Sequence, residues 1–197
     1  MCIKSYCLFL TRFYSKNLTN SLNKPMYINP IIASPLPEEA LLQRYRHEGC
    51  YTDCYYMEIP RHITMSEYIA AFYTTPIFKV ERKILALIAG KHSTDEAVRN
   101  LALGHEEKFS VWRVEGRSSN QLLLCDMLGR TRSWLMLEAK PSSSRLYFGS
   151  AVMPKSKSAA GKASFGFAFY ALHSFHHLYT KALMRAAQAK LVHKTFT

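Results

Sequence analysis

The fold of this chain is decided by residues 108–153, which read KFSVWRVEGRSSNQLLLCDMLGRTRSWLMLEAKPSSSRLYFGSAVM. Apolar runs alternate here with two turn signals, LGR at 128–130 and PSSS at 141–144. Short strands spaced about 8–12 residues apart are typical of an antiparallel meander. The stretch therefore predicts four consecutive strands: Lys108–Glu115, Gln121–Met127, Thr131–Ala139 and Arg145–Met153. The second of these is apolar on both faces, as expected of a central strand.

Another strand is expected upstream, at Tyr51–Ile59, because this run is rich in aromatic residues and ends at a proline. Its alternation places Tyr51, Asp53, Tyr55 and Met57 on one face.

Short helices are predicted before and after this strand. The first would span Pro37 to Gly49. The capping-box sequence at 64–67 starts the second, a third with an apolar stripe ends at Gly90, and a fourth runs from Ser93 to about Gly104.

One long helix is predicted after the meander. Residues 158–192 contain no proline and carry an apolar stripe, and a helix of that length spans roughly 50 Å. The order of elements predicts an α+β fold: an antiparallel sheet of about five or more strands wrapped on a long C-terminal helix, with two or three short helices inserted after the first strand. Such a sheet would leave a cavity between itself and the helix.

The chain has 197 residues and a formal net charge of +12, which suits one domain with extras. All 14 acidic residues lie between Glu38 and Glu138, and the two ends carry only basic charges. We expect a single domain over 34–197 and an N-terminal extension over 1–33, which is either a transit-like segment or an upstream stretch before a start at Met26.

The basic ends leave three interpretations open: they only keep the protein soluble, they attract it to an anionic membrane surface, or they bind nucleic acid. The sequence argues against nucleic acid, because the excess positive charge does not lie on the predicted folded domain. The chain contains no run of 18 apolar residues. The five cysteines are scattered and form no metal-binding pattern, which favours reduced, buried thiols and a cytoplasmic protein. A peripheral association with a membrane stays open as an alternative. The oligomeric state is not indicated.

The element order resembles the helix-grip fold of the START and polyketide-cyclase-like (SRPBCC) superfamily, in which a sheet wraps a long C-terminal helix over a ligand cavity. The stretches YTDCYYMEIP, FSVWRVEGRSSNQLLLCDMLGRTRSWLM and RLYFGSAV also resemble an uncharacterised family of small bacterial proteins. The superfamily resemblance implies ligand binding. The chain shows five predicted strands where that fold has about seven, so one side of the cavity would be open.

Candidate ligand contacts follow from this layout. His176 lies inside the apolar stripe of the long helix, where a polar group must find a partner or meet a ligand. An inward arginine would bind an anionic ligand, and tyrosines on the first long strand would line the cavity. The predicted ligand-binding residues are His176, Arg113, Trp112, Tyr55, Tyr51, Trp134, Phe169 and Tyr179.

Alternatives stay open for several of these residues. His173 and His177 are spaced for one metal ion, but no third ligand can be named, and the sequence favours surface or core histidines over a metal site. Asp53 is either cavity lining or solvent-facing. The chain carries no recognisable catalytic or cofactor motif, and no cofactor is expected.

Three functions remain possible. The first is a binding protein for a small hydrophobic or amphipathic ligand. The second is an enzyme of the cyclase or hydrolase type that uses the same cavity, with His176 as general base. The third is a protein that docks to an anionic membrane or to a partner through its basic ends.

Overall fold

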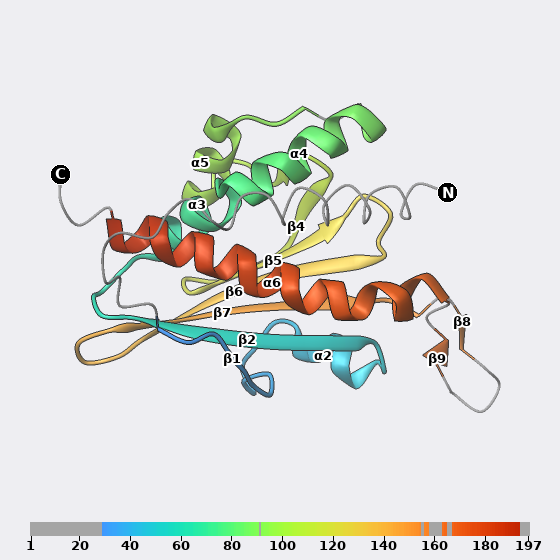
Figure 1. Ribbon diagram of the computed structural model, residues 1–197, viewed down its shortest axis with the longest axis horizontal. Coiled ribbons are helices and arrows are strands. Elements are labelled where there is room, and N and C mark those ends of the chain that lie inside the picture. Colours follow the sequence, from blue (N-terminus) through green and yellow to red (C-terminus); the bar gives the residue numbers. More distant parts are fainter. Residues whose placement is uncertain (1–28, 91, 155, 158–162, 165–166, 194–197) are drawn as a thin grey trace.

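The computed structural model describes residues 29–90, 92–154, 156–157, 163–164 and 167–193. A seven-stranded antiparallel sheet forms the middle layer, four helices cover one face, and a short N-terminal segment with one helix covers the other (Figure 1). The α+β class and the C-terminal helix are confirmed.

The strands are β1 (Ile32–Ala33), β2 (Tyr51–Ile59), β3 (Lys108–Phe109), β4 (Trp112–Arg117), β5 (Gln121–Asp126), β6 (Thr131–Ala139) and β7 (Ser144–Val152). Their order across the sheet is β1-β2-β7-β6-β5-β4-β3, so β4 to β7 form the predicted meander. The last strand of the meander pairs with β2 over nine residue pairs, Tyr51↔Val152 through Ile59↔Ser144. This pairing joins two parts of the chain that are about ninety residues apart.

The helices are α2 (Gln43–His47), α3 (Met65–Tyr73), α4 (Pro76–Ala89), α5 (Asp95–Leu103) and α6 (Phe167–His193). The capping box predicted at Thr64 and Glu67 is present. Gly90 and Gly104 end α4 and α5 in the left-handed conformation, as predicted.

The main core lies between the sheet and helices α3 to α6. Phe72 of α3 stacks on Phe148 of β7 with ring centroids 4.8 Å apart. Tyr68 donates a hydrogen bond to the carbonyl of Tyr147, and Tyr73 shares one with Ser133. The space between the middle of the sheet and α6 is thus filled by side chains of α3.

A smaller core lies on the opposite face, under the segment that contains α2. It includes Leu42, Tyr45, Cys54 and Trp134. Gln121 of β5 holds this segment, because its side-chain oxygen accepts from the backbone N–H of Leu41 and its amide donates to the carbonyl of Glu39.

Several predicted boundaries were wrong. The expected strand Lys108–Glu115 is a tight hairpin, because the chain turns at Ser110, whose φ is +56°, and pairs Phe109 with Trp112. The expected helix from Pro37 to Gly49 is helical only over α2, since turns occupy the residues before it. The long helix begins at Phe167 rather than Ser158, and β8 (Ser156–Lys157) pairs with β9 (Ala163–Ser164) in the stretch that precedes it.

The described fold begins before Ser34. Ile32 and Ala33 pair with Tyr56 and Tyr55 at the edge of the sheet. The side-chain amide of Asn29 donates to the carbonyl of Glu58, and the Gln188 amide of α6 donates to the carbonyl of Asn29. The expected extension over 1–28, including Met26, lies outside the described residues.

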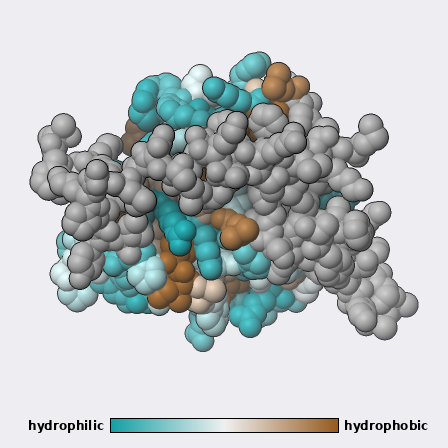
Figure 2. All heavy atoms as spheres, in the orientation of Figure 1, coloured by the Kyte–Doolittle hydropathy of each residue, from teal (hydrophilic) through white to brown (hydrophobic). Residues whose placement is uncertain are grey.

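In the part of Figure 2 that is not drawn in grey, hydrophobic residues form small separate patches. Large exposed hydrophobic side chains are spread over several elements: Ile32, Leu87, Leu103, Met127, Leu128 and Leu178. Among the described residues, no helix is long and apolar enough to cross a lipid bilayer. Cys50, Cys54 and Cys125 are buried free thiols, as expected, while Cys2 and Cys7 lie outside the described residues.

Candidate functional site

A polar row crosses the helix-facing side of the sheet. Asp53 of β2 lies directly opposite Ser150 of β7, which in turn lies opposite Ser133 of β6. The next row along the strands, Tyr55, Phe148 and Leu135, belongs to the apolar core. The polar row therefore separates the packed core from the end of the sheet at which β2 begins and β7 ends.

Asp53 is the centre of this row. Its side chain is only 7% exposed, and both oxygens have a polar neighbour, although Oδ2 accepts no hydrogen bond from the described residues. Oδ1 accepts from the backbone N–H of Ser150 at 2.9 Å and from its hydroxyl at 2.8 Å. Oδ2 lies 2.8 Å from Nε2 of His176, on α6. A buried carboxylate without such donors would be strongly unfavourable.

These contacts keep Asp53 ionised. Burial alone raises the pKa of its carboxyl, but the His176 imidazole and the two Ser150 donors outweigh burial, and the pKa is lowered. Asp53 in turn affects its neighbours on β2. Burial, with the charge of Asp53 next, raises the pKa of Tyr55 to about 12 and also raises the pKa of Tyr51, so both hydroxyls stay protonated.

A second histidine is held beside the first. The hydroxyl of Tyr55 forms a hydrogen bond with Nδ1 of His177, and the two rings pack edge to face with centroids 5.9 Å apart. The rings of His176 and His177 have centroids 6.3 Å apart. Two alternate residues of β2, Asp53 and Tyr55, thus each bind one of two consecutive histidines of α6.

The cluster contains a serine, a histidine and an aspartate, but it is not a catalytic triad. In a triad, the base accepts the serine proton through one ring nitrogen and donates to the carboxylate through the other. Here Ser150 and Asp53 approach the same nitrogen, Nε2 of His176, and the Ser150 hydroxyl donates to Asp53. Ser150 is therefore a positioning residue for Asp53, and the arrangement does not support nucleophilic attack by its hydroxyl.

The geometry favours one tautomer of the His176 imidazole. Nε2 faces an ionised carboxylate, so it carries the proton in the neutral ring. Nδ1 is then the nitrogen whose lone pair accepts. The His176 side chain is 32% exposed, so the buried acid lies behind an imidazole that solvent or a small molecule reaches.

Of the predicted ligand residues, His176, Tyr51 and Tyr55 come together in this cluster. Asp53, which was left open between cavity lining and solvent, is buried in it. Ser150 and His177 were not predicted as ligand contacts. The signal for Ser150 was a serine within an otherwise apolar strand, but its partner depends on the pairing of β2 with β7.

The other predicted residues lie elsewhere. Trp134 is fully buried on the opposite face, where its Nε1–H donates to Gln121. Trp112 and Arg113 are on β4, four strands away from β2 and thus roughly 19 Å off at about 4.8 Å per strand. Tyr179 binds Glu81 of α4 through its hydroxyl, and the side chain of Phe169 lies outside the described residues.

The metal hypothesis for the histidines receives no support from the part of the chain that the structure describes, which holds no group of three or more potential metal-binding side chains. The side chain of His173 is not among those described.

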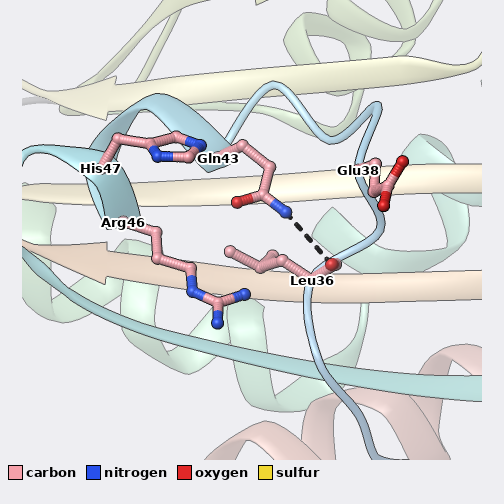
Figure 3. A pocket seen from close by; sticks show the side chains of 5 residues that line it. All are labelled: Leu36, Glu38, Gln43, Arg46 and His47. Atoms are coloured by element: carbon pink, nitrogen blue, oxygen red, sulfur yellow. Dashed lines mark hydrogen bonds between the residues drawn. The ribbon is translucent and has the colours of Figure 1, made fainter.

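Two hollows lie on the opposite side of β2, around the segment that contains α2. The larger, of about 710 Å³, is lined by Leu36, Glu38, Gln43, Arg46 and His47 (Figure 3). All five come from one continuous stretch, and the Gln43 amide in it already donates to the carbonyls of Leu36 and Pro37. The smaller, of about 340 Å³, shares Leu36 and Arg46 and extends to the edge of β2. The smaller one brings Arg46 of α2 together with Asp53 and Cys54 of β2, whereas the larger one draws all its charged residues from a single stretch.

The chain matches no family model, no curated protein and no solved structure.

Proposed function

We propose that this protein binds a small hydrophobic or amphipathic molecule between the sheet and the first half of α6, with the Asp53–His176 pair as the polar end of the site. One observation carries the proposal: a buried, ionised carboxylate lies next to the apolar core on the helix-facing side of the sheet, and its Oδ2 is 2.8 Å from a partly exposed imidazole. A binding site of this kind is largely apolar, with a few fixed polar groups that orient the ligand.

The position of the pair in the fold supports the same proposal. Side chains of α3 fill the space over the rows that contain Phe148 and Ser133. The Asp53 row marks the limit of this packing, and α6 continues beyond it over the end of the sheet (Figure 1). The proposed site is therefore smaller than the full sheet–helix cavity of a helix-grip fold and lies at one end of the sheet.

The test is native mass spectrometry of the purified protein under gentle and denaturing conditions, together with titration by the uncharged fluorescent amphipath N-phenyl-1-naphthylamine. We expect a small-molecule mass that is lost on denaturation, or saturable binding of the dye, and we expect Tyr51→Ala and His176→Ala to weaken either signal.

Arg46→Ala is the matched control, since Arg46 lines both hollows on the opposite side of the sheet. It should leave both signals unchanged. An apo mass without saturable dye binding would contradict the proposal, and loss of binding in Arg46→Ala alone would move the site to the opposite face.

A further inference from the structure

The Asp53–His176 pair contains a buried charged group, which the orientation of a ligand would not require. A neutral hydroxyl could fix the tautomer of an imidazole, whereas Asp53 is a carboxylate at 7% exposure. Its Oδ1 accepts two hydrogen bonds from Ser150, and its Oδ2 lies 2.8 Å from Nε2 of His176. A carboxylate directed at one ring nitrogen also stabilises the imidazolium that forms when the other nitrogen takes a proton. The remaining nitrogen, Nδ1, is on the ring that is 32% exposed.

We propose that His176 is a general base oriented by Asp53, and that the bound molecule is a substrate with a weakly acidic C–H bond next to a carbonyl group. This inference rests on the proposed ligand site and names its chemistry. Nδ1 takes the proton, and the electron pair of the C–H bond moves to the carbonyl oxygen as an enolate. The imidazolium then returns the proton to another atom of the same molecule, so the net reaction is an isomerisation and needs no further reactant.

Ser150 has a definite place in this arrangement. Its N–H and O–H both bind Oδ1 of Asp53, which leaves Oδ2 as the only carboxylate oxygen directed at Nε2. Asp53 and Ser150 are opposite one another in the β2–β7 ladder, so the sheet itself fixes this orientation. The proximity of Oδ2 and of the Ser150 hydroxyl to Nε2 favours the tautomer with the proton on Nε2, in which Nδ1 carries the lone pair.

This geometry makes Asp53→Asn an unusually specific test. The two Ser150 donors require an oxygen at the Oδ1 position, so the asparagine NH₂ group must face Nε2 of His176. Nε2 then becomes the acceptor, and the proton moves to Nδ1. Nitrogen NMR of the histidine ring should show the Nε2–H tautomer in the wild type at neutral pH and the Nδ1–H tautomer in Asp53→Asn. A wild-type ring protonated on Nδ1 would overturn the proposal without any knowledge of the substrate.

Base activity can be measured with 5-nitrobenzisoxazole as the probe. A base removes its ring C–H proton, the N–O bond breaks, and the electron pair ends on the oxygen of a coloured cyanonitrophenolate. We expect saturable turnover by the wild type and a loss in kcat of about 100-fold in His176→Gln, the lower end of what general-base catalysis contributes. Asp53→Asn should lower kcat similarly and leave KM within about twofold, since it changes the state of the base and not the site.

His62→Gln is the control, because His62 is an exposed histidine remote in sequence from α6. It should keep the wild-type kcat. Equal kcat in the wild type and in His176→Gln, with saturable binding of the probe, would overturn the general base while the ligand site stands. If neither this probe nor N-phenyl-1-naphthylamine binds, the proposed function itself falls.

Discussion

Gly149 and Ser150 are adjacent in β7 and face opposite sides of the sheet. On each side, the neighbouring residues explain why this particular residue fits. Ser150 turns toward α6 and holds the carboxylate of Asp53. Gly149 turns toward the opposite face, where Trp134 and Leu42 pack closely over it. The polar site and the small core therefore meet at two consecutive residues.

Gly149→Ala should destabilise the protein. A Cβ at this position would lie 2.7 Å from the carbonyl oxygen of Asp53 and 2.9 Å from Cε3 of Trp134, both of which are fixed by packing. Overpacking of this kind costs about 1–3 kcal/mol. Urea unfolding measures the effect, with Ser142→Ala in the exposed turn as the control that should stay within about 0.5 kcal/mol of the wild type. Equal stability of Gly149→Ala and the wild type would show that Trp134 moves freely.

Gln121→Met should also be costly. The Gln121 side chain is 6% exposed and binds Leu41, Trp134 and Glu39 together. Methionine keeps the volume but leaves two N–H groups and a carbonyl without partners, a loss of roughly 2–3 kcal/mol. Chemical denaturation with tryptophan fluorescence reports both the stability and the environment of Trp134.

Gln43→Met is the comparison for Gln121→Met. The half-buried Gln43 amide donates to two carbonyls of the same segment, and water can reach these carbonyls when the amide is removed. Its effect should be clearly smaller. Similar losses for the two variants would mean that burial of Gln121 does not matter.

At the scale of elements, local signals located most helices and strands. Gln121 to Asp126, Thr131 to Ala139 and Ser144 to Val152 match the predicted strands within one residue at each end. These elements could be predicted because alternation, turn residues and helix caps act over a few neighbouring residues. The boundary that was wrong at Ser110 carries no Gly or Pro that marks the change, whereas Gly166 directly precedes the start of α6 in the sequence.

The capping box at the start of α3 is a local signal whose contribution to stability can be measured. The Thr64 hydroxyl accepts from the N–H of Glu67 at 3.1 Å, and the Glu67 carboxylate accepts from the N–H of Thr64 at 2.8 Å. Thr64→Ala should lower the free energy of unfolding by about 1 kcal/mol. Thr64→Ser retains the hydroxyl and should be nearly neutral. If the serine variant loses as much as the alanine variant, the methyl group and not the cap is responsible.

At the scale of the whole molecule, charged groups attach the outer segment to the sheet. Glu115 of β4 is 17% exposed and accepts from Arg132 of β6 at 3.1 and 3.2 Å, while Tyr45 of α2 donates to it at 2.5 Å. Burial raises the pKa of Glu115, but Arg132 and Tyr45 outweigh burial and lower it. Asp53 has a lowered pKa on the other face.

Stability should therefore fall in acid. Because the carboxyl pKa is lower in the folded than in the unfolded state, each group adds stability above its unfolded-state pKa of about 4 and loses it as the pH falls through the folded-state value. Urea unfolding between neutral pH and pH of roughly 3 should show this loss. Glu115→Gln should be less stable at neutral pH and depend less on pH. Parallel pH curves for the variant and the wild type would contradict a role for Glu115.

The sequence by itself determined the α+β class, the meander, the faces of β2 and the caps of three helices, because these follow from periodicity and from contacts within a few residues. It also singled out His176 and Tyr55, since a histidine in an apolar stripe and tyrosines on one strand face are visible without a structure. The same prediction included Trp134, Trp112 and Arg113, because a single cavity was expected to be lined by all of these residues.

Tertiary structure alone decided which of these residues meet. The register of β2 against β7 sets Asp53 opposite Ser150, and the packing of α6 brings His176 and His177 onto Asp53 and Tyr55. These contacts join positions about a hundred residues apart, and a shift of the register by one residue would turn every side chain of the row to the other face. The site is a property of long-range pairing, which no local pattern encodes.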